Sequence, residues 1–487
     1  MLRKLTSIAF VFVLVAAACG SDDDTDADDA EAPAATEAMA DDSGDDMADD
    51  DMADDDMADD DMADDDMADD DMAEGDHLAC GLGNGQQATG EPIVIGNVTT
   101  SVPGIDFSTG PLMMKAFFDC VNANGGIHGR PLEMVWENDN LNPADAAAAA
   151  RKLVETDQVV ALAGGFSILD CPVNAGYYEE QGYKVIVSGV PAACFSSPNI
   201  AATNMGPAYS ALGAAQAVVA KGAAGKVVTT TGITPTSHYY NSLAGIYVQQ
   251  HGLEWEDVQH ELPLSDATSI VLDLVNRAGD GGGVILNFTP PEGLKILKAA
   301  EEQGLIDRVL WGSSTPLNDS SVAVALGPAW EGNINVNAEF SLLDDPRPDV
   351  ELYRQVTAQF NPDPTLGSFQ QMGFVAGQIL VHALLEMDPA DLDDPVAVNA
   401  AIGAVANFET DHLCKPWYFG GLPLGNVPNN WDYNVVPNGV DRMVDDSGCF
   451  EIAEVDPILI AVRDAERAGG LTADEPNNWT GGLGSGG

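Results

Sequence analysis

The sequence predicts an α/β protein with two lobes, each built on a mainly parallel β-sheet. From Glu91 onward, short apolar runs alternate with longer amphipathic runs, which is the pattern of parallel strands connected by helices. The region from Cys80 to Arg463 is also too long for one compact hydrophobic core. We therefore expect two lobes within residues 80–463.

The individual elements follow from periodicity and from turn signals. Residues 110–124 carry apolar side chains at helical spacing, and Pro143 suits the first position of the next helix. We expect the strands to span 93–98, 131–139, 159–165, 184–189, 226–232, 256–262, 283–288 and 308–313. We expect the helices to span 110–124, 143–155, 172–182, 207–222, 239–251, 266–278, 292–303 and 367–386. The stretch 415–454 favours short strands and turns.

The first nineteen residues have the layout of an export signal. Arg3 and Lys4 precede a short apolar run, which small residues and then Cys19 follow. This order resembles the lipobox of bacterial lipoproteins and implies cleavage after residue 18 and lipidation of Cys19. The alternative is an ordinary secretion signal with an incidental cysteine.

Residues 19–79 are expected to form a disordered tether after the lipidated cysteine. Positions 21–79 contain no Lys or Arg and hold 29 of the 78 acidic residues of the chain. Much of this segment is a MADDD repeat, whose period of five fits neither a helix nor a strand face. Dense like charge with little hydrophobicity cannot form a core. Ion binding by the repeat is left open, and residues 464–487 are expected to be a flexible tail.

The charge and the motifs exclude several classes of function. A net charge of −59 argues against nucleic-acid binding. The sequence lacks HExxH and GxSxG, and Val227 after Lys226 breaks a potential phosphate loop. We therefore expect a protein that is not an enzyme and has no cofactor or metal. We also expect a monomer.

Six cysteines remain after Cys19, which in an exported chain predicts three disulfides. The sequence alone permits 15 pairings. Helix 110–124 carries Cys120 on its apolar face, where Cys80 can pin the end of the tether. Cys171 and Cys194 lie in loops after adjacent strands, and Cys414 and Cys449 bracket the terminal strands. We predict the pairs Cys80–Cys120, Cys171–Cys194 and Cys414–Cys449.

The segment VNANGGIHGRPLEMVWENDNLNPADAAAAARKLVE at 121–155, with VVALAGG and PEGLKILKAAEEQGL, resembles the leucine/isoleucine/valine-binding type of periplasmic solute-binding protein. The resemblance implies a type I periplasmic binding protein with two doubly wound lobes and a three-strand hinge. Lobe one is placed at 91–206 and 338–422, and lobe two at 207–337 and 423–463.

The resemblance further implies an extracytoplasmic, lipid-anchored solute-binding protein of an ABC importer. Its partners are a small polar ligand, such as an amino acid or an amide, and a membrane permease with its ATPase. A ligand-sensing receptor domain of the same fold is an alternative, which the lack of a later membrane span disfavours. A secreted lipid-anchored hydrolase is a less favoured one.

The ligand is expected between the lobes, at the carboxyl ends of the strands. Asp170 or Glu292 is the candidate partner for a ligand ammonium group. If neither is, a neutral amide or urea-like ligand fits the hydroxyl-rich loops better. The expected ligand-binding residues are Phe107, Phe166, Ser167, Asp170, Val190, Ala192, Ser237, Tyr239, Thr289, Glu292 and Ser314.

Overall fold

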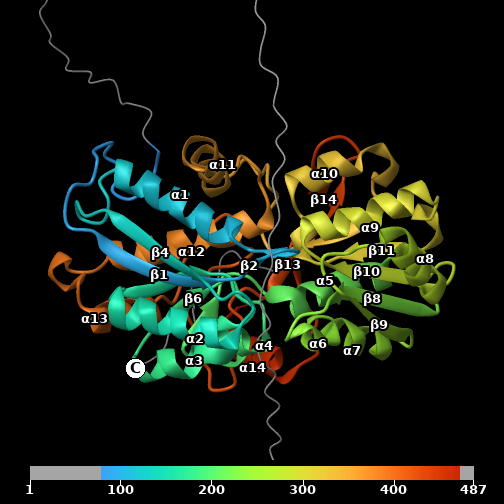
Figure 1. The fold of residues 1–487 in the computed structure, drawn as a ribbon, viewed down its shortest axis with the longest axis horizontal. Helices are drawn as coiled ribbons and strands as arrows, with labels where there is room; N and C mark the ends of the chain where they lie inside the picture. The colour runs from blue at the N-terminus through green and yellow to red at the C-terminus, as the bar shows by residue number, and fades with distance from the viewer. Residues whose placement is uncertain (1–77, 472–487) are drawn as a thin grey trace, which may run out of the picture. The chain divides into compact units, whose positions relative to one another are not determined.

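The structure, a computed structural model, describes residues 78–471. These residues all lie in the compact unit Asp71–Gly487. They form two sheets with helices on both faces (Figure 1), which confirms the predicted α/β fold with two sheets. The expected signal segment, most of the tether and the end of the tail lie outside the described residues. The first part of the expected tail, 464–468, is not a tail but the end of the helix Pro457–Ala468.

The first sheet is entirely parallel and has the strand order β4-β1-β5-β6-β7. Helices α1, α11 and α12 pack together on one face, and α2 and α3 pack together on the other (Figure 1). The strands are β1 (Ile93–Thr99), β4 (Leu132–Asn138), β5 (Ala161–Gly165), β6 (Val185–Val187) and β7 (Ile200–Ala202). The helices are α1 (Thr109–Ala123), α2 (Pro143–Arg151), α3 (Asp170–Glu180), α4 (Ala192–Ser196), α11 (Pro348–Phe360), α12 (Ser368–Leu385) and α13 (Pro395–Gly403).

The second sheet has the order β14-β13-β12-β11-β10-β8-β9, and β15 pairs with β13. Its strands β8 to β12 are parallel, whereas β13 to β15 are antiparallel. The strands are β8 (Lys226–Gly232), β9 (Glu254–His260), β10 (Gly283–Asn287), β11 (Leu310–Ser313), β12 (Ile334–Ala338), β13 (Trp431–Pro437), β14 (Met443–Asp445) and β15 (Phe450–Glu451). The helices that follow in sequence are α5 (Gly206–Ala220), α6 (Ser237–Tyr240), α7 (Ser242–Gln250), α8 (Ala267–Ala278), α9 (Pro290–Glu302), α10 (Ser320–Leu326) and α14 (Pro457–Ala468). Helices α5 and α7 cover one face and α8 and α9 the other.

The elements β7, α4, α10, α11, α13 and α14 were not among those predicted, and other departures have a local cause. The single helix expected at 239–251 is divided at Asn241, whose side chain donates to Asp257 Oδ1 at 2.7 Å. Strand β12 was not predicted because its sequence INVNA alternates asparagine with apolar residues, although every one of its residues is buried. A short hairpin of β2 (Ser101–Val102) and β3 (Ile105–Asp106) also follows β1.

The turn that carries the family resemblance has the backbone that its glycines require. Gly126 has φ +61°, and a Cβ there would lie 2.2 Å from the carbonyl oxygen of Arg130. Only glycine fits this reversal between α1 and β4. The three predicted disulfides, Cys80–Cys120, Cys171–Cys194 and Cys414–Cys449, are all confirmed.

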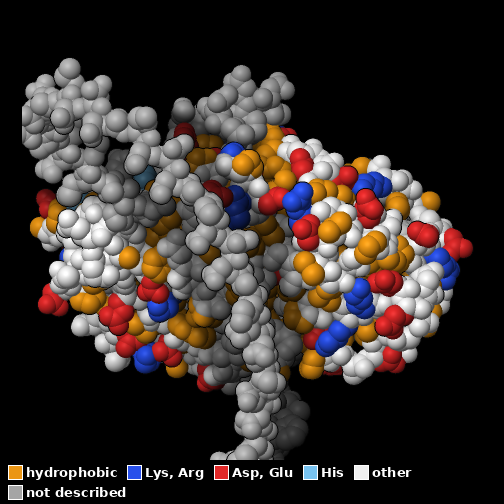
Figure 2. Space-filling view, turned by 90° about the horizontal axis from the view of Figure 1, so that it is seen from above, with side chains coloured by type: hydrophobic (Ala, Val, Ile, Leu, Met, Phe, Trp, Pro, Cys, Tyr) orange, Lys and Arg blue, Asp and Glu red, His pale blue; other side chains and the backbone are white. Residues whose placement is uncertain are grey.

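The surface visible in Figure 2 mixes charges of both signs. Lys and Arg side chains lie scattered among Asp and Glu over the half that contains the second sheet, on the right of the view. Within residues 78–471, no helix is long and apolar enough to cross a membrane. In the same range, no group of three or more His, Cys, Asp or Glu side chains is arranged to hold a metal ion.

Candidate ligand-binding cavity

A cavity lies where the carboxyl ends of strands from both sheets meet. Its empty space, counted together with the open solvent at its mouth, is about 650 Å³. From the first sheet, loops after β1, β5 and β6 contribute, and from the second, loops after β8, β10, β11 and β12. The lining residues are Ile105, Phe107, Phe166, Ile168, Val190, Asn204, Gly206, Pro207, Ser210, Thr231, Gly232, Thr234, Tyr240, Leu262, Asn287, Phe288, Thr289, Thr315, Pro316, Glu339, Phe369 and Met372.

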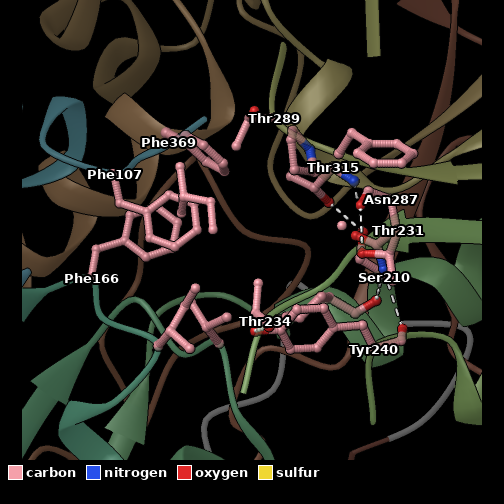
Figure 3. A pocket seen from close by; sticks show the side chains of 18 of the residues that line it. Phe107, Phe166, Ser210, Thr231, Thr234, Tyr240, Asn287, Thr289, Thr315 and Phe369 are labelled. Atoms are coloured by element: carbon pink, nitrogen blue, oxygen red, sulfur yellow. Dashed lines mark hydrogen bonds between the residues drawn. The ribbon is translucent and has the colours of Figure 1, made fainter. Parts of the chain in front are cut away.

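Three phenylalanines form one wall of the cavity (Figure 3). Phe107 and Phe166 stack with ring centroids 4.3 Å apart and planes 11° apart. Phe369, at the start of α12, meets both rings edge-on, with centroids at 5.5 and 4.8 Å. Because these rings come from three separate segments and fix one another in favourable geometries, this wall is preformed for an apolar ligand group.

The opposite wall is polar and internally hydrogen-bonded (Figure 3). The hydroxyls of Ser210 and Thr315 lie 2.7 Å apart, and Ser210 also donates to Asn337 Oδ1 at 2.8 Å. Thr231 Oγ1 donates to the carbonyl oxygen of Asn287 at 2.9 Å. These groups come from α5, β8, β10, β12 and the loop after β11, so the network fixes the position of this wall relative to the second sheet.

Tyr240 completes the wall on the side of α6. Its hydroxyl lies 2.8 Å from Thr236 Oγ1 and accepts a bond from Thr234 Oγ1 at 3.2 Å. Burial raises the pKa of the Tyr240 phenol above its ordinary value. The ring therefore remains a neutral hydrogen-bonding group throughout the physiological range.

Glu339 is the acidic residue of the cavity lining, and it is only 2% exposed. It directly follows β12, and its Oε2 accepts from the backbone N–H of Met205 at 2.9 Å. Burial raises the pKa of this carboxyl to about 7, although hydrogen bonds from Met205, Thr315, Ser210 and Gly206 oppose the rise. Glu339 thus lies against the start of α5. Its pKa places the change between its neutral and charged forms near neutral pH.

The start of α5 needs a glycine for a packing reason. Gly206 has φ +74°, and a Cβ there would lie 2.5 Å from the ring of Phe195. Glycine lets the chain turn into α5 beside this ring. As a result, the helix starts at the cavity, where both Gly206 and Pro207 line it.

Four of the eleven residues expected from the sequence line this cavity: Phe107, Phe166, Val190 and Thr289. The other seven do not line it: Ser167, Asp170, Ala192, Ser237, Tyr239, Glu292 and Ser314. Several of these lie one residue from a lining position. Ser167 precedes Ile168, Tyr239 precedes Tyr240 and Ser314 precedes Thr315.

The hydroxyl residues outside the cavity have partners within the protein. Ser167 Oγ donates to Asp139 Oδ2 at 2.5 Å. Ser237 Oγ lies 2.9 Å from Gln259 Oε1, and Ser314 Oγ lies 2.8 Å from Asn287 Oδ1. Each hydroxyl thus holds its own loop in place.

The two carboxylates expected to receive a ligand ammonium are likewise engaged elsewhere. Asp170 is buried and accepts from Asn174 Nδ2 and the Tyr178 hydroxyl, each at 2.7 Å. Burial raises the pKa of Asp170 to about 6. Glu292 pairs with Lys295 at 2.8 Å and accepts from the backbone N–H of Leu264.

The remaining two residues lie in local structure beside the cavity. Ala192 is half-buried at the start of α4, and Tyr239 packs its ring against the hydrophobic core. Burial raises the pKa of Tyr239 above its ordinary value. Neither side chain lines the cavity.

The sequence did not identify the lining residues Ser210, Tyr240, Asn287, Glu339 and Phe369. Asn287 could have been found, because it lies next to the end of the strand predicted at 283–288. Glu339 could not, since the strand before it was not recognised. Phe369 lies on the apolar face of a predicted helix, where a core position and a site position have the same pattern.

Comparisons with known proteins agree with this architecture. A family model described as periplasmic binding protein matches residues 92–423, so the chain belongs to the periplasmic binding protein family. Within that family, the predicted resemblance to branched-chain amino-acid-binding proteins is confirmed. Membership of the family implies a location outside the cytoplasm.

Three solved structures share the fold. A fatty acid ABC transporter substrate-binding protein from Thermomonospora curvata has a TM-score of 0.62 at 17% identity, covering 77% of this chain and 96% of that one. An R. palustris solute-binding protein in complex with benzoate has a TM-score of 0.62 at 18% identity, with coverages of 76% and 99%. The branched-chain amino acid transporter substrate-binding protein of Streptococcus pneumoniae, in complex with isoleucine, has a TM-score of 0.58 at 15% identity, with coverages of 73% and 100%.

One curated relative matches locally. An amino acid binding protein of Pseudomonas aeruginosa is 33% identical over 69 residues, which is 14% of this chain and 18% of the relative. The match thus spans less than a fifth of that protein's length.

Proposed function

We propose that the protein is a lipid-anchored, extracytoplasmic solute-binding protein that delivers a small organic molecule to an ABC importer. The observation that carries this proposal is the cavity, because its lining combines loops at the carboxyl ends of both sheets. An apolar wall faces a wall of fixed polar groups, which is the composition of a small-molecule site. The amino acid or amide expected from the sequence falls within this class of ligand.

The proposal includes the two-lobe division expected from the sequence. Lobe one comprises 91–206 and 338–422, and lobe two comprises 207–337 and 423–463, so that three crossovers form the hinge. Closure of the lobes around the ligand would present the loaded state to a permease and its ATPase. The ligand is released unchanged, and the protein acts as a monomer.

A ligand screen with a matched pair of variants tests this function. Amino acids, amides, aromatic acids and fatty acids are screened by thermal shift, and hits are measured by calorimetry while the compound is checked for turnover. Thr289→Trp fills the cavity mouth, whereas Thr268→Trp adds the same bulk at an exposed position of α8. We expect binding to disappear in the first variant and to persist in the second.

Three results would contradict the proposal: no binding of any compound, equal binding by both variants, or chemical conversion of the bound compound. The importer role is checked separately by uptake of a labelled hit into cells with and without the protein. Unchanged uptake in its absence would refute delivery to an importer.

A further inference from the structure

The charged side chains that line the cavity and the space outside its mouth are all acidic. No Lys or Arg is among the residues that line it, and Glu339 is its acidic group. An outer vestibule shares Ile105, Thr289, Pro316 and Phe369 with the cavity and adds Asp106, Glu292, Asp319 and Asp363, again without a lining cation. Lys295 neutralises Glu292, but nothing in the vestibule lining offsets the other acids.

Backbone N–H groups can bind an anion without any cation, but three consecutive N–H groups after β5 are occupied here. The N–H of Ile168 donates to Thr100 Oγ1 at 2.9 Å. The next two N–H groups, of Leu169 and Asp170, donate to Ser167 Oγ at 3.0 and 2.8 Å. A ligand carboxylate at the start of α3 would therefore have to displace hydrogen bonds that the protein makes to itself.

The same holds for one N–H group in each of two further loops. The N–H of Gly189, after β6, donates to Asn204 Oδ1 at 2.6 Å. In the second sheet, the N–H of Thr315 donates to Ser210 Oγ at 2.7 Å. Both donors lie at cavity-lining segments, and both are satisfied by side chains of this chain.

The start of α5 holds the protein's own carboxylate. Glu339 Oε2 accepts the N–H of Met205 at 2.9 Å, at the helix end whose dipole favours negative charge. An anionic ligand at this position would meet a buried carboxylate, and two carboxylates that share a site cannot both ionise readily. Asp432, buried nearby and bonded to Asn337, has its pKa raised well above the ordinary value by burial and by the charge of Glu339.

Resting on the proposed function, we infer that the cavity selects an apolar molecule whose polar end is an N–H donor, an amine or a carboxamide, and that it rejects the corresponding carboxylate. The apolar body, a ring or a branched chain, packs against Phe107, Phe166 and Phe369. The N–H group donates to Glu339, and the acidic vestibule attracts cations and repels anions. Glu339 is thus the specificity-determining residue.

Ligand sets that share one apolar body test this selection in the wild-type protein. One set is benzylamine, benzamide and benzoate, and the other is isoleucinamide and isoleucine. The carboxylates of these sets are the compounds bound by two of the structural relatives. In calorimetry at pH 7.5, we expect each amine or amide to bind at least tenfold tighter than the carboxylate of its set. Equal or tighter binding of benzoate or isoleucine would overturn the inference and leave the solute-binding function intact.

A matched pair of variants tests the role of Glu339. Glu339→Gln keeps the shape and the acceptor for Met205 but removes the charge, so benzylamine should lose at least tenfold in affinity. Glu331→Gln, at an exposed position, should bind benzylamine like the wild type. Unchanged affinity in Glu339→Gln would overturn the inference. If no compound of either set binds the wild type, the inference is wrong, and the broad screen with Thr289→Trp decides separately whether the proposed function fails.

Discussion

At the scale of single residues, the cavity holds an acid whose protonation is set by burial. Glu339 has a pKa of about 7 in the folded protein, above the ordinary value of about 4.5 that it regains on unfolding. Between these values the folded state binds more protons than the unfolded state, so stability falls as pH rises through this window. The carboxyl is thus held at a cost in stability near neutral pH.

This cost gives a first prediction. The free energy of unfolding of the wild type should fall by about 3 kcal/mol between pH 4.5 and pH 7 because of Glu339, and Glu339→Gln should remove this fall. Urea unfolding at pH 5 and pH 8 measures the effect, and Glu331→Gln serves as the exposed control. If the wild type and the variant differ in free energy of unfolding by the same amount at both pH values, Glu339 is not a buried titrating acid. The pKa of the buried Asp432 also depends on the charge of Glu339, so the measured difference in stability includes the response of Asp432.

His412 gives a second prediction with the opposite sign. It is fully buried, with Nδ1 lying 3.3 Å from Gln371 Nε2 and its ring against Tyr353 and Phe374. Burial lowers its pKa to about 3, so the unfolded chain alone gains a proton as pH falls from about 6.5, and stability is lost towards pH 3. The advantage of the wild type over His412→Gln should shrink by about 1.4 kcal/mol per pH unit between pH 6 and pH 4. Urea unfolding over this range checks the slope, and a constant difference would contradict it.

At the scale of elements, α14 is held by a buried cluster of charges. Glu466 is fully buried and lies 3.0 Å from Lys415 Nζ, while its Oε1 accepts from the Tyr418 hydroxyl at 2.6 Å. Arg463, on the same helix, donates to the carbonyl oxygen of Asn430 at 2.6 Å. This cluster ties α14 to the segment that leads into β13, which is one of the crossovers between the proposed lobes.

Removing one charge from this cluster should be costly. Glu466→Gln removes the buried carboxylate that pairs with both Lys415 and Arg463, so we expect a loss of about 3–5 kcal/mol in the free energy of unfolding. Glu454→Gln is the matched control, because Glu454 pairs with Arg467 at the surface and should contribute less than about 1 kcal/mol. Chemical denaturation of both variants gives the comparison. Equal losses would mean that the cluster does not depend on Glu466.

At the scale of the whole molecule, the fold followed from the sequence more completely than the site. Parallel strands such as β1, β5 and β10 are buried apolar runs and were identified, whereas β12 was hidden by its two asparagines. The loops at the strand ends were located correctly, but periodicity ends where a strand ends. Whether Ser314 or Thr315 faces the cavity depends on loop backbone that no repeat encodes. Glu339 was missed because its strand was missed.

The attachment of the whole molecule to a membrane is the last prediction, and it rests on the sequence of residues 1–19 alone. Arg3 and Lys4, the apolar run and the small residues before Cys19 have the order of a lipoprotein signal. One acyl chain gives only marginal membrane binding, so a stable anchor needs the several chains of a lipoprotein. Cys19→Ser should release the protein into the medium with its cavity intact, and Cys19→Ala should do the same. Fractionation of cells followed by calorimetry on the released protein measures both effects, and a Cys19→Ser protein that stays with the membrane at wild-type levels would refute the anchor.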